Sequence, residues 1–219
     1  NSAILINKIS KIRAFRLKSS RKRTYEMADF PYLFGEERQP CNDFLLIPKV
    51  SSENRKYIPI GYMTPEDIIT DKVFAFPNAS LYHFGVLTSI MHMVWTKYIC
   101  GRLESRYSYS NTIVYNNFPW PENPTEKQIT AIEEAAQKVL DTRLEFPNSS
   151  LADLYDPLTM PPALVKAHNE LDKAVDLAYR PQPFTSEANR MEFLFGLYEK
   201  YTADLFTKAK PKKRKSMSK

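Results

Sequence analysis

The stretch that follows Cys100 gathers charged, hydroxyl and aromatic side chains in one short segment, GRLESRYSYSNTIVYNNFPW. Glu104 and Arg106 stand two residues apart, and on an extended backbone such residues point to one face, which Ser108 continues. An arginine can donate two hydrogen bonds to guanine O6 and N7, and a glutamate can accept one from cytosine N4. The pair therefore matches the major-groove edge of one G·C base pair, whereas its spacing alone favours an exposed ion pair worth little.

A second polar segment, IPKVSSENRKYIP, places cations and hydroxyl groups between two apolar runs. Such side chains supply the charge and the directional donors that DNA phosphates accept, without reading the base sequence. The candidate phosphate contacts are Lys49, Ser51, Ser52, Arg55 and Lys56. A solvated turn between two strands explains the same residues, and the segment taken by itself favours that simpler explanation.

The motifs of several enzyme classes are absent from the sequence. The three histidines, His83, His92 and His168, lack the spacing of metal ligands and are expected to pack against or cap helices. No carboxylate-x-Lys nuclease motif, glycine-rich phosphate loop or Asn/Asp-Pro-Pro-Tyr methyltransferase motif occurs. Cys41 and Cys100 lie far apart and form no CxxC pair. We therefore expect no catalytic residue, metal ligand or bound cofactor within this chain.

The elements that must position the polar residues are short in the first half of the chain. Residues 4–17 repeat apolar side chains at helical intervals with lysines between them, which predicts a basic amphipathic helix. Runs at 44–50, 57–63 and 72–76 predict strands, and Pro48 and Pro59 predict that the first two are edges or bulged. Ser80 can cap a long buried helix from Leu81 to about Leu103, after which the Glu104 segment follows as strand or loop.

The second half reads as helical. Prolines 119, 121 and 124 mark a linker, and Thr125-Glu-Lys-Gln128 is a capping box that opens a helix to about residue 146. Helical patterns follow over 162–179 and 186–202. The expected fold class is α+β: a mixed α/β domain over residues 1–120 with short strands and a long buried helix, an all-α C-terminal domain over 121–207, and a disordered basic tail over 208–219.

Charge divides the chain in the same way. Its net charge is +6, but residues 1–120 are basic, residues 121–207 are acidic, and the tail carries cations without an acid. A basic half suits a surface that lies on a polyanion such as DNA. We see no membrane span or signal peptide and expect a cytoplasmic protein. The opening Asn1-Ser2-Ala3, without methionine, leads us to expect a piece of a longer protein.

Several long sequence segments closely resemble segments of the MmeI-like (type IIL) restriction-modification enzymes, and the resemblance extends over about residues 9–202. They are IPKVSSENR, YIPIG, LYHFG, GRL and IVYNNFPWP in the first half, and SLADLYDPLTMPPAL in the second. Enzymes of that family join a nuclease, an S-adenosylmethionine-dependent adenine-N6 methyltransferase, a target recognition domain and a C-terminal helical part. This chain resembles the last two parts, and the absence of the other motifs departs from the full-length pattern.

The resemblance implies that Glu104, Arg106 and Ser108 read bases, because the family's base-reading positions follow its Gly-Arg-Leu phrase. It also implies a chain that binds double-stranded DNA and works with methyltransferase and nuclease domains of one polypeptide, which would use S-adenosylmethionine and Mg²⁺. The alternative is a protein-interaction module that does not bind DNA, in which the acidic helices dock on sibling catalytic domains. Steep salt dependence of DNA binding would separate the two.

Overall fold

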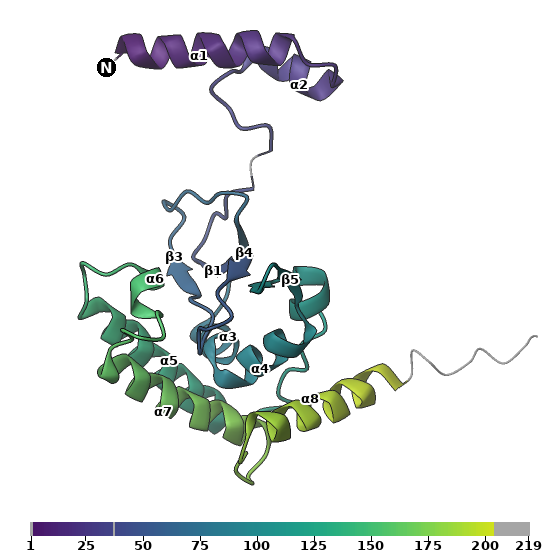
Figure 1. The fold of residues 1–219 in the computed structure, drawn as a ribbon, viewed down its shortest axis with the longest axis vertical. Helices are drawn as coiled ribbons and strands as arrows, with labels where there is room; N and C mark the ends of the chain where they lie inside the picture. Colours follow the sequence, from purple (N-terminus) through teal and green to yellow (C-terminus); the bar gives the residue numbers. More distant parts are fainter. Residues whose placement is uncertain (1, 37, 204–219) are drawn as a thin grey trace, which may run out of the picture. The chain divides into compact units, whose positions relative to one another are not determined.

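The computed structural model describes residues 2–36 and 38–203 (Figure 1). The chain divides into two compact units, Asn1–Gln39 and Pro40–Lys219. Residues 204–219, which include the basic tail expected at 208–219, lie outside the described residues. The expected boundary at 120/121 lies inside the second unit and stays a prediction.

The first unit contains helix α1 (Ser2–Leu17), helix α2 (Lys22–Glu26) and the 3-10 turn η1 (Met27–Asp29). The helix predicted over residues 4–17 is confirmed, but its expected amphipathic character is not, because α1 buries no residue and Leu5, Ile12 and Phe15 are exposed. Arg16 fixes the turn that follows. Its guanidinium donates hydrogen bonds to the carbonyl oxygens of Met27 and Phe30 at 2.8 Å and of Leu33 at 2.6 Å. These three bonds hold the backbone of residues 27–33 against the end of α1.

Three short strands of the second unit form an antiparallel sheet in the order β3-β1-β4. They are β1 (Phe44–Pro48), β3 (Gly61–Met63) and β4 (Val73–Pro77). Pro48 was expected to mark an edge strand or a bulge, and both are wrong: β1 is central, with Leu45 opposite both Tyr62 and Phe76, and its register from Phe44 to Pro48 is uninterrupted. The proline is tolerated because it is the last residue of the strand. β3 does lie at an edge, and Pro59 precedes it.

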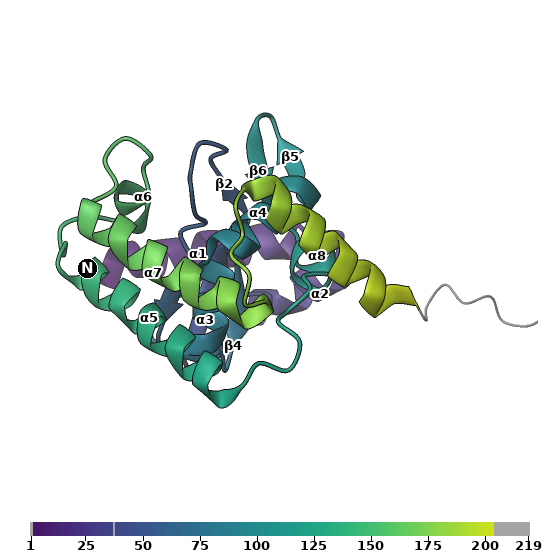
Figure 2. The ribbon, with the colours of Figure 1, turned by 90° about the horizontal axis from the view of Figure 1, so that it is seen from below.

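A second sheet has the order β2-β6-β5 (Figure 2), and of the predicted site residues its strands contain Ser51, Arg106 and Ser108. Its strands are β2 (Val50–Ser51), β5 (Gly101–Leu103) and β6 (Arg106–Ser108). A short π-helix, η2 (Asn111–Tyr115), follows β6 directly.

The long helix expected between Leu81 and Leu103 is two helices, α3 (Leu81–Thr88) and α4 (Ile90–Ile99). The break falls at Ser89, whose backbone is extended at φ −77° and ψ 165°. The Ser89 hydroxyl donates to the Val86 carbonyl at 2.7 Å, and the Ile90 amide donates to the carboxylate of Asp172 at 2.7 Å. A side chain 82 positions away in sequence thus satisfies the start of α4.

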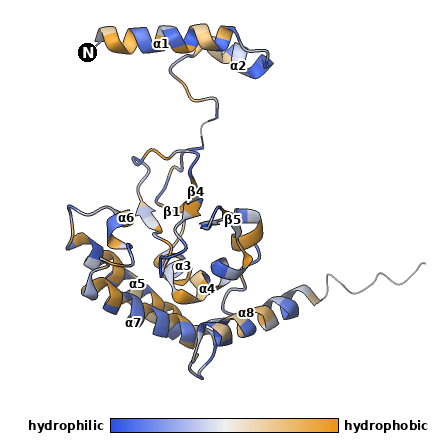
Figure 3. Cartoon of the chain, in the orientation of Figure 1, coloured by the Kyte–Doolittle hydropathy of each residue, from blue (hydrophilic) through white to orange (hydrophobic). Residues whose placement is uncertain are grey.

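The rear of the chain is helical, as expected: α5 (Glu126–Leu144), α6 (Leu151–Leu154), α7 (Pro162–Tyr179) and α8 (Glu187–Thr202). The capping box at the start of α5 is confirmed, since the Thr125 amide donates to Gln128 Oε1 at 2.9 Å and the Gln128 amide to Thr125 Oγ1 at 3.3 Å. Helices α5 and α7 lie side by side, and each alternates hydrophobic and hydrophilic segments along its length (Figures 1 to 3).

Helix α3 packs so closely on the rear helices that the two halves of the second unit share one core. A Cβ atom added to Gly85 would lie 2.6 Å from the Ile132 side chain of α5 and 3.3 Å from the Leu171 side chain of α7. Glycine is the residue that lets the helices approach this far. The strands that carry the predicted site are therefore built on the same core as α5 and α7.

Candidate functional site

Glu104 and Arg106 lie at the tip of a β-hairpin. Strands β5 and β6 pair with Leu103 opposite Arg106, so Glu104 and Ser105 form a two-residue turn. Glu104 has φ 60°, a left-handed conformation that is uncommon for a residue with a side chain. The expectation that an extended backbone aligns the pair is therefore wrong. A tight turn brings the two side chains together, with Arg106 Nη2 donating to Glu104 Oε2 at 2.7 Å.

The pair is available to a ligand. The Glu104 side chain is 77% exposed and the Arg106 side chain 44% exposed, and an ion pair this exposed stabilises a fold by at most about 1 kcal/mol. Glu104 and Arg106 can therefore give up their bond to each other and bind a ligand instead, with little effect on the stability of the fold. An adjacent carboxylate and guanidinium present acceptors and paired donors within one side-chain length of each other, which suits a ligand edge that also alternates donors and acceptors.

The opposite face of β6 and the residue after it anchor the hairpin on the core. Tyr107 and Tyr109 are buried, and the Tyr109 hydroxyl donates to His92 Nε2 at 3.1 Å. His92 Nδ1 donates to the Leu87 carbonyl at 2.8 Å, so the ring is the tautomer that accepts at Nε2. Burial lowers the pKa of His92 to about 4, which keeps the ring neutral at physiological pH. The base of the hairpin is therefore held while its tip stays open.

Ser108 lies at the far end of β6 from the turn. It is half-buried and stands opposite Gly101 on one side and Val50 on the other. The structure thus brings Ser108 onto the same strand as Arg106 but toward the sheet's interior.

The first part of the predicted phosphate segment lies beside the hairpin. β2 pairs with β6, and the Tyr109 amide donates to the Lys49 carbonyl at 2.8 Å. The Lys49 ammonium lies 4.8 Å from the centroid of the Phe74 ring. Ser52 accepts a hydrogen bond from the Asn54 amide at 3.3 Å and shapes the turn. Ser51 is buried, and among the described residues its hydroxyl has no hydrogen-bond partner.

Arg55 and Lys56 turn away from the hairpin toward the rear helices. Arg55 Nη2 donates to the Ala152 carbonyl at 3.4 Å, a long bond, and its Nε is buried without a partner in the described part of the chain. Lys56 donates to Asn169 Oδ1 at 3.3 Å and is itself exposed. The structure therefore separates these two cations from Lys49, although all three stand on one segment.

Glu53 is part of the site, and the sequence reasoning missed it. A hydrogen bond from the Ser105 side chain lowers the pKa of the Glu53 carboxyl. The nearby guanidinium groups of Arg102 and Arg106 lower it further. The Tyr107 hydroxyl also donates to the Glu53 carbonyl at 3.3 Å. These partners are about 50 residues away in sequence, so no local pattern could indicate the contact.

The histidines pack and cap, as expected. The Ser80 amide donates to His83 Nδ1 at 3.2 Å, which completes a capping box at the start of α3, while His92 and His168 are buried. Over residues 2–36 and 38–203 we find no group of three metal-ligating side chains. No helix in the described ranges is long and apolar enough to cross a membrane.

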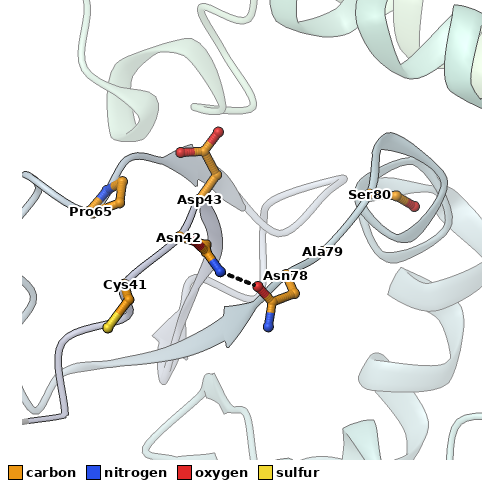
Figure 4. Close-up of a pocket in the computed structure, with 7 residues that line it drawn as sticks. All are labelled: Cys41, Asn42, Asp43, Pro65, Asn78, Ala79 and Ser80. Atoms are coloured by element: carbon orange, nitrogen blue, oxygen red, sulfur yellow. Dashed lines mark hydrogen bonds between the residues drawn. The ribbon is translucent and has the colours of Figure 1, made fainter.

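An open pocket of about 440 Å³ lies where β1 begins and β4 ends (Figure 4). It is lined by Cys41, Asn42, Asp43, Pro65, Asn78, Ala79 and Ser80. Asn42 Nδ2 donates to Asn78 Oδ1 at 2.8 Å across it, so this donor and this acceptor are already paired. None of the predicted site residues lines this pocket.

Comparison with known proteins gives consistent matches over both halves. Residues 1–122 match the family model for the MmeI target recognition domain, and residues 124–206 match that for the MmeI C-terminal domain. DNA methyltransferase A of Bacillus subtilis (strain 168) is 39% identical over 202 residues, which are 92% of this chain and 23% of that protein. A solved structure of the type IIL restriction-modification enzyme MmeI in complex with DNA has a TM-score of 0.83 and 49% identity, covering 91% of this chain and 26% of that one. The chain thus spans about a quarter of the length of these relatives.

Proposed function

Because the chain belongs to the MmeI family, with regions that match its target recognition and C-terminal domains, we propose that it binds duplex DNA and reads a specific base sequence. The observation that carries the proposal is the exposed Glu104–Arg106 pair at the tip of a hairpin whose base is anchored on the core. The basic first half supports the same reading, since it can neutralise phosphates. Because bacterial DNA lies in the cytoplasm, we also propose that the protein is cytoplasmic.

Arg106 and Glu104 read the two bases of one pair in the major groove. The guanidinium leaves Glu104 and donates to guanine O6 and N7, while the freed carboxylate accepts from N4 of the paired cytosine. The exchange needs little free energy because the pair is exposed in the free chain. Ser108 contributes a hydroxyl on the same strand, which can donate to or accept from a neighbouring base.

Contacts to phosphates come from the segment beside the hairpin. Lys49 and Ser52 flank β2, which pairs with β6, and Arg55 and Lys56 extend the contact toward α6 and α7 by exchanging one protein hydrogen bond each. Ser51 is left out of this set because its hydroxyl is buried. Phosphate contacts set affinity and its salt dependence, whereas the hairpin sets the sequence.

Catalysis belongs to partner domains of a longer polypeptide. The relatives are a DNA methyltransferase and a restriction-modification enzyme, and we infer that the complete protein uses S-adenosylmethionine for methylation and Mg²⁺ for cleavage. The residues present here do not fit either group. The sequence lacks the Asn/Asp-Pro-Pro-Tyr motif, and the described residues hold no carboxylate cluster for a metal. This chain therefore directs methylation and cleavage to a site, and the chemistry is done elsewhere.

The test is to select bound sequences from a pool of randomised DNA duplexes with the 219-residue chain. We expect one enriched sequence that contains a G·C pair, bound with an affinity that falls steeply as salt rises. Recovery of a random pool, with no salt-dependent binding, would contradict the proposal and favour the protein-interaction module.

A further inference from the structure

Residues 50–60 connect the hairpin to the rear helices through two separate sets of contacts. At its start, the segment is part of the second sheet, where Val50 stands opposite Ser108 and Ser51 opposite Tyr107. Within the described residues, β2 is the strand that flanks β6 on the side away from β5. The lateral position of the hairpin therefore depends on where β2 is held.

The end of the segment is held by the rear helices. The Tyr57 hydroxyl donates to Asp172 Oδ2 of α7 at 2.7 Å, and Arg143 Nη1 of α5 donates to the Ile60 carbonyl at 2.8 Å. Tyr57 and Ile60 are fully buried. Strand and loop residues that are buried and bonded in this way cannot shift unless the helices shift with them.

Tyr57 is also fixed across its ring face. The His168 ring stacks on it with the two centroids 4.0 Å apart. Arg143 donates to the Tyr155 hydroxyl oxygen through Nε at 3.0 Å, which leaves the hydroxyl proton for His168 Nε2 at 2.6 Å. Burial first, and then the charges of Arg143 and Lys56, hold the pKa of His168 well below its ordinary value, so the ring stays neutral and accepts the hydrogen bond from the Tyr155 hydroxyl.

We propose that the C-terminal helices hold the base-reading hairpin in place through residues 50–60, and that Tyr57 and Arg143 are positioning residues for sequence recognition. The inference rests on the proposed function of the hairpin. Neither residue needs to touch DNA, because each acts through the strand that flanks β6. Base readout depends on donors placed within fractions of an ångström, so a small shift of the flanking strand weakens the preference for the correct sequence more than it weakens binding to phosphates.

A matched pair of substitutions separates positioning from general stability. Tyr57→Phe removes the bond to the Asp172 carboxylate, and Tyr179→Phe removes a bond from a tyrosine hydroxyl to the neutral Pro119 carbonyl at 2.8 Å. Burial raises the pKa of both tyrosine hydroxyl groups, so both are protonated donors in the wild type. Tyr57→Phe should lower the melting temperature more, because its acceptor is a carboxylate, so the two variants are compared at equal distance below their own melting temperatures. Only Tyr57 belongs to the segment that flanks the hairpin.

The readout is the ratio of affinities for the selected duplex and for a duplex with the G·C pair reversed, measured at equal distance below each melting temperature. We expect Tyr57→Phe to lower this ratio about two- to ten-fold and Tyr179→Phe to leave it unchanged. Amide hydrogen exchange at residues 107–109 should become faster in Tyr57→Phe only. If Tyr57→Phe does not fold, Arg143→Lys replaces it in the same two measurements, because this change breaks the paired hydrogen bonds from Arg143 to the Tyr155 hydroxyl.

Equal ratios and equal exchange rates in the two phenylalanine variants would overturn the positioning role while leaving the proposed function intact. A wild-type chain that shows no preference between the two duplexes would overturn the proposed function itself, and the positioning role with it.

Discussion

Exchanging the charges of the hairpin pair should invert the preference for one base pair. In Glu104→Lys with Arg106→Asp, the cation that donates to guanine stands first and the acid that accepts from cytosine stands second. The two side chains are 77% and 44% exposed, so the double change should alter the free energy of unfolding by less than about 1 kcal/mol. A correct base contact discriminates by about 1–3 kcal/mol, which is roughly ten-fold to more than a hundred-fold in affinity.

The assay is the selection of bound duplexes with the double variant, followed by affinities for the original sequence and for the one with that pair reversed. Each single change should only weaken binding, because it leaves one base without a partner. The control exchanges the exposed ion pair of Glu122 and Lys200, as Glu122→Lys with Lys200→Glu, and should leave the selected sequence unchanged. Selection of the original sequence by the hairpin double variant, at undiminished affinity, would refute the reasoning and reduce the pair to a surface ion pair.

Three further predictions concern the salt, pH and packing behaviour of the chain. Lys49→Gln should reduce the slope of log affinity against log salt by about one and leave the selected sequence unchanged; an altered sequence would make Lys49 a base reader. Burial raises the pKa of Asp172 to about 6, so the folded state binds a proton at this carboxyl group more tightly than the unfolded state does. This difference stabilises the folded state fully below about pH 4, and the contribution is lost as the pH rises through 6. The melting temperature should fall between pH 4 and 7 in the wild type and should fall less in Asp172→Asn. The same fall in both proteins would show that the titration of Asp172 does not cause it. Gly85→Ala should destabilise the fold by about 1–3 kcal/mol because its Cβ would lie 2.6 Å from Ile132, whereas Gly196→Ala, with no atom within 4 Å of its Cβ, should be neutral or stabilising by up to about 1 kcal/mol in chemical denaturation.

Local signals in the sequence predicted the rear helices well. The capping box at Thr125 and the helical pattern of Pro162–Tyr179 both match the structure, because caps and helical periodicity are encoded within a few residues. The break at Ser89 was not predictable in this way. The side chain that makes it favourable is Asp172, which only the fold brings to the start of α4.

The candidate site was predicted by residue type and not by geometry. Glu104 and Ser105 carry none of the usual glycine or asparagine signals of a two-residue turn, so an extended strand was the natural expectation. The same limit applies to Glu53, whose contact with Ser105 joins segments far apart in sequence. The same holds for Arg55, which donates to the carbonyl of Ala152 in α6 and so points to the rear helices instead of the hairpin.

A crystal structure of the chain with its selected DNA duplex tests the central claim most directly. We expect the β5–β6 hairpin in the major groove, with the Arg106 guanidinium nitrogens about 2.9 Å from guanine O6 and N7 and the Glu104 carboxylate near N4 of the paired cytosine. A complex in which Arg106 keeps its 2.7 Å bond to Glu104 and both side chains face solvent would contradict the account.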